Sequence, residues 1–117
     1  MCYDPANVYF YSNGRINPVE DLKYALDYID IIHFKGVYHN QDKSKWSFPL
    51  MKDSIIEFDS IFRVLKSYNY SKMIAIEIEN MFKFEKGKGF FKDRSLQENE
   101  IIDAYNSEIG YIGDKLI

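Results

Sequence analysis

The sequence is poor in cysteine and histidine and has no long apolar run, and each scarcity excludes a class of protein. The single cysteine, Cys2, cannot form an internal disulfide, which excludes a disulfide-stabilised scaffold and favours the reducing cytoplasm. The longest stretch without a charged residue, 5–14, is too short and too polar to span a bilayer. The first residues lack the basic start and apolar run of a secretory signal. We therefore expect a cytoplasmic protein without a membrane segment.

The chain also lacks an excess of positive charge. Its net charge is −3 and its pI is near 5.3, whereas nucleic-acid binders usually carry a basic stripe or balance. One local basic cluster is diluted by neighbouring acids and is interpreted as a solvated loop rather than a phosphate-binding patch. Its members are Lys83, Lys86, Lys88, Lys92 and Arg94. We expect no nucleic-acid partner.

Aromatic and apolar residues, in contrast, are plentiful. Of the 117 residues 46% are hydrophobic, with ten tyrosines and nine phenylalanines, which argues against disorder and suits one core. We predict a single domain over residues 1–117.

Three segments read as strands. Residues 29–37 and 72–79 are near-continuous apolar runs, which suit a parallel sheet covered on both faces, and residues 1–4 read as a third, short strand.

Three segments read as helices. Asn17-Pro18 with Glu20 is a helix start, with Asn17 as N-cap and Glu20 bonding back to it. The helix that begins there and a second one over residues 58–68 each carry apolar side chains along one face, which are interpreted as core packing. A terminal helix is predicted over about 95–114, starting at Ser95. The connection 38–57 is long, as functional loops often are.

The alternation of strands and helices predicts an α/β fold of three βα units with parallel strands. Asp4, His33 and Glu77 end the three strands, and the carboxyl ends of parallel strands meet where ligands bind. Such a ligand set suits Mn²⁺, Mg²⁺, Co²⁺ or Zn²⁺. Taken singly, Asp4 before Pro5 could be a turn starter, His33 a hydrogen-bonded core histidine, and Glu77 the exit of a strand into solvent.

Three motifs occur in an order that resembles the xylose-isomerase-like barrel family of sugar isomerases and epimerases. Residues 31–37, IIHFKGV, are similar to that family's "v-H-l-K-D" strand. Residues 58–66 with Tyr70 and 74–77 resemble its closing helix and "i-x-i-E" strand, and residues 2–7 resemble its "D-p-x-N/H" strand end. The resemblance covers about residues 1–82 and implies a partial (β/α)8 TIM barrel, its last three βα units.

The resemblance also implies roles for residues. Asp4, His33 and Glu77 would be the ligands of a divalent metal, and Glu77 would also transfer the proton that isomerises or epimerises a sugar through an enediolate. Asn7 and Lys35 would contact the substrate, a sugar or sugar phosphate. Gly36 departs from the pattern, because the family has an Asp there.

A complete barrel of this kind needs about 250 residues. We therefore expect the isolated chain to be inactive. Self-association or a complementary N-terminal half-barrel would supply the missing barrel strands. One alternative is a non-catalytic half-barrel, vestigial or serving interaction. A remoter one is a relative of the apurinic-site endonucleases, whose histidine-rich sites contrast with the two histidines of this chain, His33 and His39. His39 is interpreted as a solvated loop residue, and Trp46 and Phe48 as loop packing rather than a wall over a sugar ring.

Overall fold

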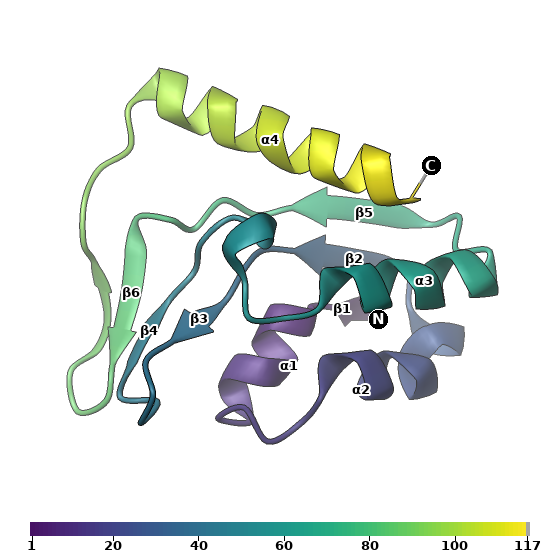
Figure 1. Cartoon of the computed structure of the whole chain (residues 1–117), viewed down its shortest axis with the longest axis horizontal. Helices are drawn as coiled ribbons and strands as arrows, with labels where there is room; N and C mark the ends of the chain where they lie inside the picture. The colour runs from purple at the N-terminus through teal and green to yellow at the C-terminus, as the bar shows by residue number, and fades with distance from the viewer. Residues whose placement is uncertain (117) are drawn as a thin grey trace.

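The computed structural model describes residues 1–116 as a mixed α/β fold that contains two sheets (Figure 1). The elements in chain order are β1 (Cys2–Tyr3), α1 (Pro5–Tyr11), α2 (Pro18–Ala25), η1 (Leu26–Tyr28), β2 (Ile31–Phe34), β3 (Tyr38–His39), β4 (Lys45–Ser47), η2 (Met51–Asp53), α3 (Phe58–Tyr68), β5 (Met73–Ile76), β6 (Phe82–Glu85), β7 (Gly89–Lys92) and α4 (Glu98–Leu116).

The first sheet is parallel and three-stranded, in the order β1-β2-β5. The predicted strands and their direction are therefore confirmed, although each strand is shorter than predicted. The chain leaves β2 early because the N–H of Gly36 donates to Pro49 O at 3.0 Å instead of to a neighbouring strand. Short strands place the polar residues that follow them directly at the edge of the sheet.

Two predicted helices form near their predicted positions. Asn17 Oδ1 accepts the N–H of Val19 at 2.9 Å, so Asn17 caps α2 as predicted. The predicted return bond of Glu20 is wrong, because Glu20 pairs instead with Lys23 at 3.0 Å. Helix α3 spans the predicted residues and is followed by Asn69, which caps it in a left-handed conformation with φ of 59°.

Helix α1 was not predicted. Asp4 was interpreted as the end of a strand and a metal ligand, or as a turn starter, but its side chain also caps a helix in which Pro5 takes the first position. Proline is well tolerated there because its missing N–H has no partner in the first turn.

The helices cover one face of the parallel sheet, and consecutive helices contact each other from α1 to α4 (Figure 1). Between them and the sheet lies a core that contains Ile32 and Phe34 of β2, both fully buried. Residues alternate between faces along a strand, so Ile31, His33 and Met73 lie on the opposite face. That face is open: Met73 is 65% exposed.

The second sheet is antiparallel, in the order β3-β4-β6-β7, and lies beyond the carboxyl ends of β2 and β5 (Figure 1). The loop interpretation of the basic cluster at 83–94 is thus wrong for Lys83 and Lys92, which lie in β6 and β7, whereas its other three members lie in the turn between these strands or after them. Gly87 and Gly89, each with φ of 85°, allow its tight turn. The long connection 38–57 contributes the other two strands.

Helix α4 begins at Glu98, so the predicted start at Ser95 is wrong. Glu100 fixes the start, because its side chain accepts the N–H of Gln97 at 3.1 Å and so gives a hydrogen-bond partner to a backbone N–H that precedes the helix. Of the helices within residues 1–116, none combines the length and apolar content needed to cross a membrane.

Candidate metal centre

Asp4, His33 and Glu77 come together at the carboxyl edge of the parallel sheet. One ligand atom from each lies within 4.8 Å of the others. The strand register explains the convergence: His33 pairs with Ala75, and Asp4 and Glu77 directly follow β1 and β5.

Asp4 uses its two carboxylate oxygens differently. Oδ1 accepts the N–H of Asn7 at 3.0 Å and caps α1. Oδ2 is buried, and among the described side chains it has no hydrogen-bond partner. A buried anionic oxygen without a hydrogen bond is costly unless a cation lies nearby. The helix cap therefore aims an unsatisfied oxygen into the cluster.

His33 and Glu77 contact each other directly, with Nδ1 of the imidazole 2.7 Å from Oε1 of the carboxylate. Both side chains are about one third exposed, at 30% and 31%. They remain accessible from solvent, as exchangeable ligands must be.

Lys35 is the buried cation of the site. Its Nζ lies 3.1 Å from Glu77 Oε2, 3.4 Å from Glu79 Oε1 and 3.4 Å from Asp4 Oδ2. We call these four residues the Lys35 cluster. Three carboxylates against one ammonium leave two formal negative charges, the charge that one divalent cation would neutralise.

The three carboxyl groups of the Lys35 cluster have pKa values that shift in different directions. Burial would raise the pKa of Glu77, but the hydrogen bond and charge of Lys35, together with His33, outweigh it and hold the pKa below its usual value. Burial raises the pKa of Asp4, and Lys35 and the Asn7 N–H offset only part of this rise. Burial, together with the neighbouring charge of Glu77, raises the pKa of Glu79 despite the attraction of Lys35.

Glu79 was not singled out from the sequence. The signal was present, because Glu77 and Glu79 are two residues apart and an extended chain places such residues on one side. It was interpreted as part of the exit of a strand into solvent, whereas its Oε1 lies 3.4 Å from Lys35 Nζ and its side chain lines a cavity with Glu77.

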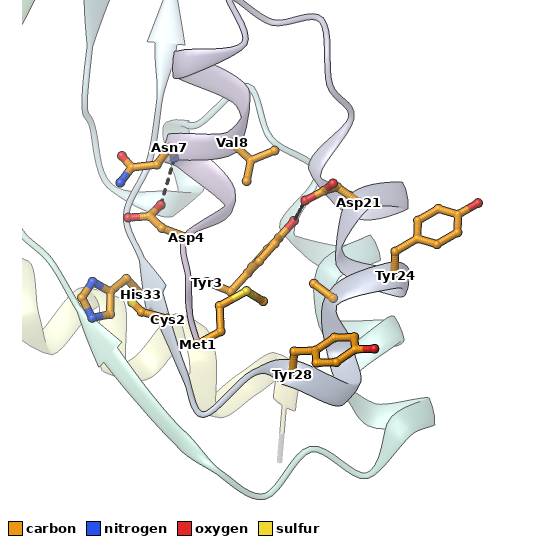
Figure 2. A pocket seen from close by; sticks show the side chains of 11 residues that line it. Met1, Cys2, Tyr3, Asp4, Asn7, Val8, Asp21, Tyr24, Tyr28 and His33 are labelled. Carbon is orange, nitrogen blue, oxygen red and sulfur yellow. Dashed lines mark hydrogen bonds between the residues drawn. The ribbon is translucent and has the colours of Figure 1, made fainter.

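A cavity of about 770 Å³ opens beside Asp4 and His33 along the edge of β1 (Figure 2). Figure 2 shows Asp4, Asn7 and His33 at one end, and Tyr24 and Tyr28 at the other. A second cavity of about 410 Å³ lies beside Lys35, Glu77 and Glu79. Asn7 lines both cavities, so both predicted substrate contacts, Asn7 and Lys35, border open space at the cluster.

Three side chains of the second sheet differ from their interpretation or refine it. His39 is not a solvated loop residue: Tyr9 Oη lies 2.8 Å from its Nε2, and Trp46 packs against its ring. Trp46 is 3% exposed and serves packing, as interpreted. Phe48 is buried too, but also lines the cavity beside Lys35.

Gly36, the departure from the family pattern, has a steric reason. A Cβ atom there would lie 2.2 Å from the backbone oxygen of Pro49 and 2.8 Å from that of Leu50. The connection after β2 folds too closely over this residue for any side chain.

The donor set fits a hard divalent cation. It offers two carboxylates and one imidazole, types that suit Mn²⁺, Mg²⁺, Co²⁺ or Zn²⁺. The hydrogen-bond-free Oδ2 of Asp4 gives this fit its structural support.

A comparison with models of protein families gives a match. The model of the family described as "Xylose isomerase-like TIM barrel" matches residues 1–95. No curated protein matches the chain.

Proposed function

Because the chain belongs to the xylose isomerase-like TIM barrel family, we propose that it carries half of the active site of a divalent-metal-dependent sugar isomerase or epimerase. In this proposal the parallel sheet is the last three βα units of a barrel. Asp4, His33 and Glu77 hold the metal, and the substrate is a small sugar. The observation that carries the proposal is the convergence of these three ligand atoms within 4.8 Å.

When bound, the cation would stabilise negative charge that develops on sugar oxygens during proton transfer. Glu77 is suited to accept a proton from a carbon acid, because Lys35 and His33 favour its ionised form. Lys35 lies 3.1 Å from Glu77 Oε2 and holds this carboxylate in place. Glu77 would return the proton to the neighbouring carbon to give the isomer, whereas an epimer would require a second acid on the opposite face of the original carbon, which the proposed partner would supply.

Asn7 would orient a substrate hydroxyl, because its side chain borders both cavities next to Asp4 (Figure 2). Its backbone N–H already holds Asp4, so the substrate contact and the metal ligand are fixed by the same turn of α1.

A partner would complete the site. β1 and β5 are the outer strands of the parallel sheet, so each has one edge without a neighbour within it. Tyr24 and Tyr28 beside the edge of β1 are 85% and 72% exposed. We propose that a complementary half-barrel or a second copy covers this edge, and that the pair works in the reducing cytoplasm, which suits the lone thiol of Cys2.

A non-catalytic half-barrel is the second candidate, and the Lys35 cluster favours it. An ammonium surrounded by three carboxylates already forms an internal ion-pair network that holds together without metal. In this case the cluster would serve the fold alone.

Manganese binding separates the two candidates. Water-proton relaxation of Mn²⁺ titrated with the full chain should reveal one site. Asp4→Asn, His33→Gln and Glu77→Gln should each weaken it roughly tenfold or more, because each removes a direct ligand. Asp103→Asn is the matched control, since Asp103 is exposed on α4.

An unchanged relaxation signal with the wild-type chain would exclude the metal site and leave the non-catalytic candidate. Equal binding by all three ligand variants would have the same meaning.

A further inference from the structure

The cavity beside the Lys35 cluster has two unlike walls. One wall is polar and consists of Lys35, Glu77 and Glu79. The other is aromatic and includes Phe82 and Phe90, which come from the hairpin β6–β7. The antiparallel sheet thus faces the candidate metal centre across about 410 Å³ of open space.

Phe82 and Phe90 are unusually accessible for phenylalanines of a sheet, at 40% and 54% exposed. Phe90 is nevertheless held firmly, because its ring centroid lies 4.9 Å from that of Phe84 and 5.4 Å from that of Phe10. One side of this ring packs on the core, and the other is left to the cavity. Aromatic faces that are fixed yet open suit the C–H groups of a ligand.

The polar wall carries no cation to spare. Lys35 is the one cationic side chain among the described residues that line this cavity, and three carboxylates already surround it. Two of the hairpin lysines are already engaged, since Lys83 pairs with Asp93 at 3.1 Å and Lys88 lies over the ring of Phe91. The other two, Lys86 and Lys92, are not among the residues that line this cavity. A phosphate here would meet carboxylates without a counter-charge.

We propose that this cavity binds the carbon chain of an uncharged sugar or polyol and rejects phosphorylated sugars. The C–H face of the ligand lies against Phe82 and Phe90, and its hydroxyls lie toward Glu79 and Asn7. The inference deepens the proposed function and rests on it, because the ligand enters beside Glu77. The hairpin β6–β7 is then the element that selects the substrate class.

Saturation-transfer NMR on the full chain with Mg²⁺ tests this proposal, with D-fructose and D-fructose 6-phosphate as probes. Irradiation of the aromatic protons should transfer saturation to D-fructose. Phe82→Ala and Phe90→Ala should each weaken D-fructose binding about fivefold, since each removes an aromatic contact. D-fructose 6-phosphate should bind about tenfold more weakly than D-fructose, because its charge is repelled.

Phe91→Ala is the matched control. Phe91 belongs to the same strand as Phe90 and pairs with Lys83, on the opposite face of the hairpin, so its loss should leave binding unchanged. Phe90→Leu keeps apolar volume against Phe84 and Phe10 without the ring, and shows whether a loss in Phe90→Ala comes from unfolding.

Equal or tighter binding of the phosphorylated sugar would overturn the proposal, above all if Lys92→Ala abolished it, because Lys92 pairs with Phe82 across the hairpin. Unchanged D-fructose binding in both phenylalanine variants, or none in the wild-type chain, would overturn it as well. Manganese relaxation on the same samples distinguishes failure of this sugar-binding proposal from failure of the proposed metal site. The aromatic variants should bind Mn²⁺ normally, whereas failure of the metal site shows as absent Mn²⁺ binding in every sample.

Discussion

The ammonium of Lys35 lies 3.4 Å from the otherwise unsatisfied Oδ2 of Asp4, and both side chains are buried. Two further carboxylates, of Glu77 and Glu79, complete the surroundings of this lysine. Without a divalent cation, Lys35 is the main compensation for the buried negative charge.

Lys35→Met should therefore destabilise the metal-free chain by about 2 to 4 kcal/mol, because it leaves buried carboxylates without a partner. Mn²⁺ should restore part of this loss and raise the melting temperature of the variant more than that of the wild type. Urea unfolding with and without Mn²⁺ measures both effects. Lys72→Met is the control: its ion pair with Asp30 is 3.7 Å long and largely exposed, so its loss should cost at most about 1 kcal/mol. Equal losses in the two variants would contradict the prediction.

Two substitutions of Asp4 should distinguish its role as the cap of α1 from its proposed role as a metal ligand. Asp4→Asn keeps an acceptor that can cap α1 but removes the charge that attracts a cation. Mn²⁺ binding should then fall while stability stays at or above that of the wild type, because a buried charge is lost. Asp4→Ala should lose Mn²⁺ binding and about 1 kcal/mol of cap energy as well. Calorimetric melting beside manganese titration distinguishes the outcomes, and equal melting temperatures of the two variants would argue against the cap.

Gly36→Ala should be strongly destabilising, by about 1 to 3 kcal/mol, because its Cβ meets the backbone of Pro49 rather than a movable side chain. Gly110→Ala on α4 makes the same chemical change where nothing lies within 4 Å. It should stabilise the chain by roughly 0.5 to 1 kcal/mol through helix propensity. Chemical denaturation of both variants gives the comparison, and a neutral Gly36→Ala would show that the connection after β2 is looser than described.

Glu108 of α4 is 1% exposed, and both of its carboxylate oxygens accept the N–H of Met51, at 3.0 and 3.3 Å. Glu108→Ala should cost about 1 to 3 kcal/mol, because the Met51 N–H loses its partner. Glu108→Gln should cost less, since the amide oxygen still accepts and no charge is buried.

Burial raises the pKa of Glu108, and the charge of Asp53 adds to this while Lys52 and the Met51 N–H oppose it. A raised carboxyl pKa means that the folded state binds the proton more tightly than the unfolded state. The stabilisation that comes from protonated Glu108 is therefore fully present below the ordinary pKa of 4.5. It is lost as the pH rises through the pKa that Glu108 has in the folded state. Unfolding free energies from pH 4 upward should therefore fall for the wild type relative to Glu108→Gln, and parallel curves would contradict this.

The parallel sheet and its polar edge could be predicted because both follow from local pattern. Apolar runs ended by Asp4, His33 and Glu77 place three side chains at one edge whatever else the chain does. The same logic failed for α1, although Asp4-Pro5 carries the cap-then-proline signature that identified α2 at Asn17-Pro18. Because residues 1–4 were interpreted as a strand, Asp4 was treated as the end of that strand and not as the start of a helix.

The antiparallel sheet was harder to predict for a physical reason. β3 and β4 have two and three residues, too few for any periodicity to show. Their pairing depends on β6, which lies far along the chain, and on packing against Phe10. Residues 82–85, FKFE, do alternate between apolar and charged, and this was the one local signal that could have revealed the hairpin.

The carboxylate of Asp4 joins the first turn of α1 to the acidic edge of the sheet, so ordering one orders the other. A cation captured by Oδ2 would reduce local fraying of the chain's opening segment. Amide hydrogen exchange at Asn7 and Val8 would then slow on metal binding, although these N–H groups touch no ion. Conversely, a mutation that unwinds this short helix would abolish ion capture from a distance, without altering a single ligand.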